Sequence, residues 1–224
     1  MVNRIARFLN RLLLIAILDL EFINLESAPR DGGLIVAGNH LGVLDALIVF
    51  YVVDQRDYIV LVAEYHRRYF LRRMLVKAAN ALFVDRYQAD FAVLREVIRR
   101  LNNGGVLMIA PEGTRSKTGG LQAGQPGTAY LAAKTGFPVL PVGIVGSQDR
   151  LILRNLKRLR RTPVKVRIGD PIYFQPVSRK DRGDQLQTYT DEIMCQIAAL
   201  LPEGNRGVYT NHRRLKDILF DKGT

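Results

Sequence analysis

The chain has 224 residues, of which 48% are hydrophobic and 24% charged, and these values suit one sizeable globular domain. The net charge of +12 is unusual, and a basic excess of this size indicates anionic partners, which would be nucleic acid, anionic lipid or phosphate-bearing substrates. Cys195 is the only cysteine, so an intrachain disulfide is excluded, and the composition suits a reducing location that faces the cytosol.

The first segment, residues 1–20, mixes basic and apolar residues at helical spacing from Arg4 to Arg11. Periodicity alone leaves two interpretations open: a first helix packed on the core, or a helix in the membrane interface with its arginines on lipid headgroups. The longest apolar run there, 12–18, is shorter than the roughly 18–20 residues that a membrane span needs, so we expect no transmembrane helix. We assign residues 1–20 to an N-terminal amphipathic, membrane-interfacial helix.

Residues 21–204 alternate between short apolar, β-branched runs and helical patterns. Because the runs are continuously apolar, they predict an α/β fold with a mainly parallel sheet of about seven strands and helices on both faces. The expected strands are 21–25, 34–38, 58–63, 81–85, 106–110, 139–145 and 164–168, and the expected helices are 44–53, 69–79, 89–102, 127–135 and 185–201. Residues 205–224 are expected to form a polar, loosely held C-terminal tail.

The strand 34–38 leads into the most informative residues of the chain. Asn39 and His40 follow it directly, and Asp45 comes at the start of the next helix. Ligands of parallel sheets bind beyond the carboxyl ends of the strands, and an imidazole held by a carboxylate is suited to general-base chemistry near neutral pH. The candidate catalytic residues are therefore His40 and Asp45, with a purely structural pair as the alternative.

Two further strands end in polar residues that belong to the same predicted sheet edge. The strand 81–85 ends at Arg86, and the strand 106–110 ends at Pro111-Glu112-Gly113-Thr114-Arg115-Ser116. Taken singly, these are a surface ion pair and a turn. Because three such ends converge, Glu112 and Arg115 suit a polar ligand, the glutamate binding hydroxyl groups and the arginine binding phosphate.

These segments resemble the four motifs of the glycerolipid acyltransferases. His40-Leu41-Gly42-Val43-Leu44-Asp45 resembles the H-x-x-x-x-D box, and Phe83-Val84-Asp85-Arg86 resembles the second block, which ends in a phosphate-binding arginine. Pro111-Glu112-Gly113-Thr114-Arg115-Ser116 resembles the P-E-G-T-R-S block, and Val139-Leu140-Pro141-Val142 resembles the fourth block. Since all four occur in order, the chain is identified as a member of the 1-acylglycerol-3-phosphate (lysophosphatidate) acyltransferase family.

Two positions depart from the family pattern. Asn80 stands where the second block usually opens with glycine, and Ala110 stands where phenylalanine usually precedes the third block. Neither change removes a chemical group, so the reaction class is unaffected, whereas the shape of the substrate pocket can differ.

The resemblance implies a complete reaction and a site. His40 would be the general base on the free hydroxyl of 1-acylglycerol 3-phosphate, and Asp45 would hold its imidazole, with amides at the start of the following helix stabilising the oxyanion. The product would be phosphatidic acid for phospholipid biosynthesis, and residues 21–204 would be the acyltransferase domain. The substrate-binding residues would be Arg86, Glu112, Gly113, Thr114 and Arg115.

The implied partners are the lysophospholipid, an anionic membrane surface, and acyl-CoA or acyl-carrier protein as co-substrate. No metal or bound cofactor is implied, and the protein would be monotopic or peripheral on the cytoplasmic face of the membrane. The acceptor could instead be glycerol 3-phosphate or another lysolipid. A non-enzymatic basic module that binds membrane or nucleic acid is the alternative from another class, although no nucleic-acid motif is present and no nucleic acid is expected.

A basic stretch, 150–167, has no acidic residue and has leucines between its cations. This pattern suits an anionic membrane surface, and it equally suits the phosphates of coenzyme A or the acidic helices of acyl carrier protein. Elsewhere, Cys195 fits a small core residue, and His66 and His212 are expected to be solvated.

Overall fold

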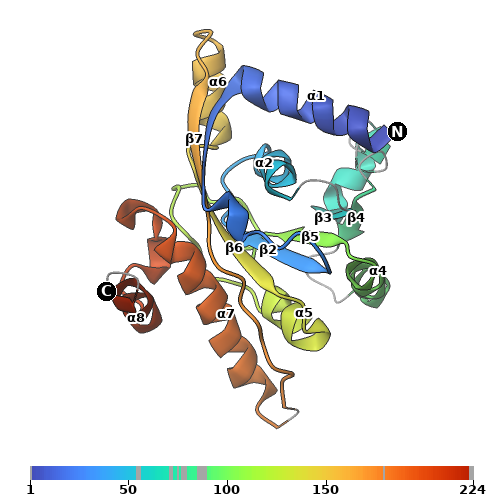
Figure 1. Ribbon diagram of the computed structural model, residues 1–224, viewed down its shortest axis with the longest axis vertical. Helices are drawn as coiled ribbons and strands as arrows, with labels where there is room; N and C mark the ends of the chain where they lie inside the picture. Colours follow the sequence, from blue (N-terminus) through green and yellow to red (C-terminus); the bar gives the residue numbers. More distant parts are fainter. Residues whose placement is uncertain are drawn as a thin grey trace.

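The computed structural model describes residues 2–53, 57–70, 73–74, 76, 80–84, 90–178 and 180–221. Within these residues the strands form one seven-stranded sheet in the order β1-β7-β6-β2-β5-β3-β4 (Figure 1). The strands are β1 Leu18–Ile23, β2 Leu34–Gly38, β3 Tyr58–Ala63, β4 Leu82–Val84, β5 Val106–Ile109, β6 Val139–Val145 and β7 Thr162–Ile168. The expected α/β fold is therefore confirmed.

The sheet is mainly parallel because five of its strands run in one direction. β7 pairs with β6 antiparallel and with β1 parallel, so β1 and β7 run opposite to the rest. The central strand β2 is buried along its whole length between β5 and β6, which explains its uninterrupted apolar sequence. β7 instead alternates between buried residues and residues that are partly or fully exposed, and its partly exposed Lys165 forms an ion pair with Glu21 of β1 at 2.9 Å.

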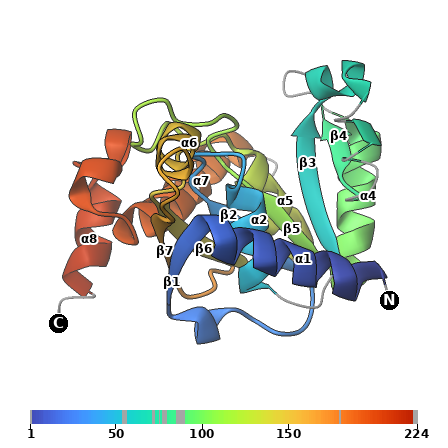
Figure 2. The same ribbon diagram turned by 90° about the horizontal axis from the view of Figure 1, so that it is seen from above.

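Helices cover both faces of this sheet, as expected (Figures 1 and 2). One apolar cluster joins α1 and α2 to one face, and a second joins α4, α5 and α7 to the other. α8 lies beside α7, on the side of the molecule opposite α1. The helices are α1 Val2–Ile17, α2 Asp45–Val52, α4 Phe91–Asn102, α5 Gly127–Thr135, α6 Asp149–Leu156, α7 Arg182–Ala199 and α8 Arg213–Asp221.

The N-terminal helix α1 packs on the core, as one of the two sequence interpretations expects, and it also exposes apolar side chains. Its Leu14 is fully buried against the cluster around α2, and Asn10 Nδ2 donates a hydrogen bond to the Leu47 carbonyl at 3.2 Å. Five large apolar side chains of the helix are exposed to solvent, namely Phe8, Leu9, Leu12, Leu13 and Ile15. The helix is thus docked on the core and still presents an apolar outer surface. Among the described residues, no helix meets the length and hydropathy that a membrane crossing requires.

The C-terminal segment differs from the loosely held tail that its polar composition predicts. α8 packs against α7, and Tyr209, Leu215 and Ile218 are all buried. The Arg214 guanidinium also pairs with the Glu192 carboxylate of α7. The expectation was wrong because the few apolar residues of this charged segment share one helix face, which is enough to dock it.

His212, which packs beside Cys195, is a second residue whose surroundings differ from the sequence-based expectation. His212 is only partly exposed, and its Nδ1 lies 3.2 Å from the buried Cys195 Sγ, so it is not the solvated residue that its neighbours in the sequence suggest. Burial raises the pKa of the Cys195 thiol to about 12, which suits the core role expected for this cysteine. The side chain of His66 lies outside the described part of the chain.

Candidate active site

His40 and Asp45 meet at the carboxyl end of β2. The His40 Nδ1 lies 2.8 Å from the Asp45 Oδ2, and the same oxygen accepts the amides of Leu41 at 2.7 Å and Gly42 at 2.9 Å. The Asp45 side chain is 8% exposed and that of His40 is 31% exposed. With Nδ1 engaged by the carboxylate, Nε2 is the ring nitrogen that remains to exchange a proton with a ligand.

The strand β6 supplies the support for this pair. Ser147, which follows β6 and is fully buried, donates its hydroxyl to the Asp45 Oδ1 at 2.5 Å. The buried amide of Asn39 fastens the end of β2 to Ile144, donating to its carbonyl at 2.8 Å and accepting its amide at 2.7 Å. These contacts fix where the turn leaves the sheet, so the position of His40 is set by backbone and buried side chains.

Glu112, in the loop after β5, is buried beneath the same turn. Its Oε1 accepts the His40 amide and its Oε2 accepts the Gln122 amide, both at 2.9 Å. Burial raises the pKa of the Glu112 carboxyl group, although the hydrogen bonds from the Gln122 and His40 amides act in the opposite direction. Because both oxygens bind amides of the protein itself, this carboxylate positions the backbone of His40.

Arg115, from the same loop, lies at the solvent side of the site. Its Nη1 is 2.6 Å from the Asp149 Oδ2, and the Asp149 Oδ1 accepts the Val43 amide at 2.8 Å. Asp149, the first residue of α6, therefore joins the turn after His40 to the loop of Arg115. The Arg115 side chain remains 46% exposed, so a ligand can reach its guanidinium.

The other predicted substrate-binding residues are Gly113, Thr114 and Arg86, and two of them are loop residues that the structure describes. Gly113 has φ +69°, a left-handed conformation that favours glycine and turns the loop. The exposed Thr114 accepts a hydrogen bond from Gln122 Nε2 on its Oγ1 at 3.3 Å. Arg86 lies outside the described residues. Across the part of the chain that is described, no group of three or more His, Cys, Asp or Glu side chains is arranged to hold a metal ion.

The structure thus brings His40, Asp45, Glu112 and Arg115 together at one edge of the sheet. The sequence did not single out Ser147 or Asp149, although both follow the correctly expected strand β6. Their position between the end of β6 and the start of α6 was the available signal, because His40 was also identified by its place after a strand.

The chain is similar to known acyltransferases. A family model described as Acyltransferase matches residues 19–145. The chain is 27% identical over 179 residues to a 1-acyl-sn-glycerol-3-phosphate acyltransferase of Cocos nucifera, and the match covers 78% of this chain and 56% of that protein. It is 28% identical over 177 residues to a protein of the same name from Borreliella burgdorferi, covering 78% of this chain and 70% of that one. The chain therefore spans little more than half of the coconut protein.

Among solved structures, the chain resembles the crystal structure of the 1-acyl-sn-glycerophosphate (LPA) acyltransferase PlsC from Thermotoga maritima. The TM-score is 0.65 at 25% sequence identity, and the match covers 88% of this chain and 78% of that one.

Gly42, in the turn after His40, is packed so closely that replacing it tests the described geometry. A Cβ atom on Gly42 would lie 2.2 Å from the Ser147 carbonyl oxygen and 2.8 Å from the Asp149 Oδ1. We expect Gly42→Ala to destabilise the fold by about 1–3 kcal/mol because buried atoms must move apart.

The matched control is Gly183→Ala in α7, where a Cβ atom meets open space. This change should be neutral or stabilising by up to about 1 kcal/mol. Urea unfolding midpoints of the two variants provide the measurement, and equal stability would contradict the packing described for the turn.

Proposed function

The chain belongs to the acyltransferase family, and from this premise we propose that it transfers a fatty acyl group from a thioester to the free hydroxyl of 1-acylglycerol 3-phosphate, giving phosphatidic acid. The observation that carries the proposal is the His40–Asp45 pair at the carboxyl edge of the sheet, with the exposed guanidinium of Arg115 on the same edge. The names of the relatives support this acceptor. The donor is acyl-CoA or acyl-carrier protein, acting as a co-substrate.

In the proposed reaction His40 is the general base. Its Nε2 takes the proton of the acceptor hydroxyl while the oxygen attacks the thioester carbonyl carbon. The tetrahedral intermediate then collapses, the carbon–sulfur bond breaks, and the imidazolium returns the proton to the leaving sulfur. Asp45 holds the productive tautomer and stabilises the imidazolium. An acyl-enzyme is unnecessary because the acceptor hydroxyl is itself the nucleophile.

The oxyanion of that intermediate needs donors other than the first amides of the turn. The amides of Leu41 and Gly42 are committed to Asp45, and the amide of Val43 is committed to Asp149. The expectation that amides at the start of the following helix stabilise the oxyanion therefore does not apply to these three. They preorganise the general base instead.

The acceptor headgroup is assigned to the residues around Arg115. In the proposal Arg115 binds the phosphate, with Arg86 as a second phosphate ligand on the strength of the family resemblance. Glu112 acts through the His40 backbone, as its contacts with two amides favour, while Gly113 and Thr114 shape the loop that carries Arg115.

The outer surface of α1 is assigned to the membrane interface. Exposed apolar side chains on a docked amphipathic helix suit one-sided attachment without a span, on the cytoplasmic face where the acceptor lipid lies. In domain terms, the interfacial segment proposed for residues 1–20 is reduced to α1, Val2–Ile17, and the acyltransferase domain begins with β1 at Leu18. We extend that domain beyond residue 204 to the end of α8, because α8 packs on α7.

The role of His40 is tested by His40→Ala. Because a general base contributes about 10²–10⁴ to a rate, turnover of lysophosphatidate with an acyl thioester should fall by at least about 100-fold. Thermal unfolding of the variant provides the control for folding. A folded His40→Ala protein with turnover near that of the wild type would exclude the role.

The role of Arg115 is tested by comparing two neighbours in the same loop. Arg115→Ala should raise the KM for lysophosphatidate about 10- to 100-fold, as expected for the loss of a charge-assisted hydrogen bond, with little change in the KM for the thioester. Lys117→Ala removes an exposed charge two residues away and should leave both values unchanged. A selective rise in the thioester KM would move Arg115 to the donor site.

The membrane proposal is tested by placing charges on α1. Deleting the helix would also remove the buried Leu14, so Phe8→Asp with Leu12→Asp is the cleaner change. Since burying such a side chain is worth about 1.5–3 kcal/mol, binding to vesicles of phosphatidylglycerol and phosphatidylcholine should fall at least about tenfold. Val208→Asp, an exposed position before α8, is the control. Undiminished co-sedimentation of the α1 variant would refute the interfacial helix.

A further inference from the structure

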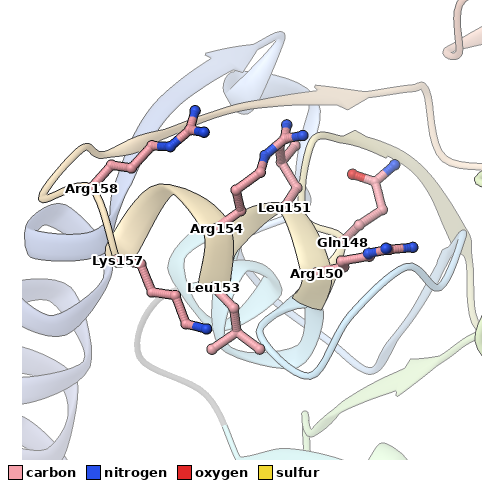
Figure 3. Close-up of a pocket in the computed structure, with 7 residues that line it drawn as sticks. All are labelled: Gln148, Arg150, Leu151, Leu153, Arg154, Lys157 and Arg158. Atoms are coloured by element: carbon pink, nitrogen blue, oxygen red, sulfur yellow. The ribbon is translucent and has the colours of Figure 1, made fainter.

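A basic cavity along α6 has no role in the reaction as described above. It has a volume of about 840 Å³, and α6 with its flanking residues forms its wall (Figure 3). Figure 3 shows the cationic side chains spread along the helix, from Arg150 beside Gln148 to Lys157 and Arg158 at the other end. The lining residues are Gln148, Arg150, Leu151, Leu153, Arg154, Lys157 and Arg158.

The charge of this cavity is not balanced within the described residues. Other cations of the basic stretch have acidic partners, such as Arg161 with Asp19 and Lys165 with Glu21. Among the described residues, the cations that line the cavity form no ion pair. The one acidic residue of α6, Asp149, pairs with Arg115 and accepts a hydrogen bond from the Val43 amide. A one-signed cavity of this kind favours an anionic ligand.

The helix that lines the cavity, α6, begins beside the catalytic turn. Asp149 at the beginning of α6 accepts the Val43 amide at 2.8 Å, three residues after His40. The eight residues of α6 then extend about 12 Å away from that contact, at about 1.5 Å per residue. A ligand with its reacting carbon at His40 and its negative charge at a distance would therefore lie along this helix.

The two substrates of the proposed reaction differ in how far their phosphate lies from the reacting group. Lysophosphatidate carries its phosphate on the carbon next to the reacting hydroxyl, so its charge stays beside His40. A thioester donor carries its phosphate at the far end of a pantetheine arm, both in coenzyme A and in a carrier protein. Only the donor matches a positive surface that begins at the site and continues away from it.

We propose that the cavity along α6 binds the phosphate at the end of the donor's phosphopantetheine arm, an inference that rests on the proposed function. Arg154, Lys157 and Arg158, toward the end of α6 that is farther from the catalytic turn, bind the anionic end, and the thioester reaches back past Arg150 toward His40. The acceptor and donor phosphates are then bound by different cations, Arg115 on the loop after β5 and the cluster on α6.

The test is a double charge reversal, Arg154→Glu with Arg158→Glu. Its control is Arg213→Glu with Lys216→Glu on α8, an equal change of charge at exposed positions. KM and kcat are measured with acyl-CoA, acyl-carrier protein and acyl-pantetheine, which lacks the phosphate. We expect the α6 variant to raise the KM for a phosphate-bearing donor at least tenfold, with unchanged kcat, acceptor KM and acyl-pantetheine KM. If the KM rises only for acyl-CoA or only for acyl-carrier protein, that donor is the natural source of the phosphate.

Direct binding separates this inference from the proposed function. Calorimetric titration of coenzyme A and of holo-carrier protein into wild type and variant needs no turnover. Binding that the α6 variant loses would support the cavity even if lysophosphatidate were not acylated. Unchanged donor KM and binding would overturn it, as would an equal loss with acyl-pantetheine. Loss of binding to anionic vesicles with unchanged donor KM would show that α6 contacts lipid instead.

Discussion

The carboxylate of Asp45 is the group on which the candidate site depends. It is buried, and a buried carboxylate is costly unless hydrogen-bond donors surround it. Here its oxygens face two turn amides, the imidazole of His40 and the hydroxyl of Ser147. The same charge therefore closes the turn after β2 and orients the ring, so the fold of the turn and the geometry of the proposed base cannot be separated.

The order of the strands explains why the supporting residues meet there. β2 lies between β5 and β6, and all three end at the same edge. The loop after β5 brings Glu112 under the backbone of His40, and the segment after β6 brings Ser147 to Asp45 and Asp149 to Val43. α6 continues from that segment, so the topology makes this basic helix begin beside the site and lead away from it.

Much of this could be predicted from sequence because its causes are local. Continuous apolar runs mark buried strands, and the residues at their ends mark the ligand edge. The contacts of Glu112 could not be predicted, since a motif gives residue types but not the direction of a carboxylate. Ser147 was missed because serine after a strand is common and its partner is 102 positions away. α8 was missed because its charges outnumber the apolar residues that dock it.

We infer that Asp45 fixes His40 as the tautomer with its proton on Nδ1, leaving Nε2 to accept a proton. Long-range ¹H–¹⁵N NMR spectra of protein labelled in histidine report the tautomer of each ring, and the spectrum of His40→Gln assigns the His40 signals. In neutral His40 we expect a protonated Nδ1 and a bare Nε2. A neutral His40 with its proton on Nε2 would contradict it.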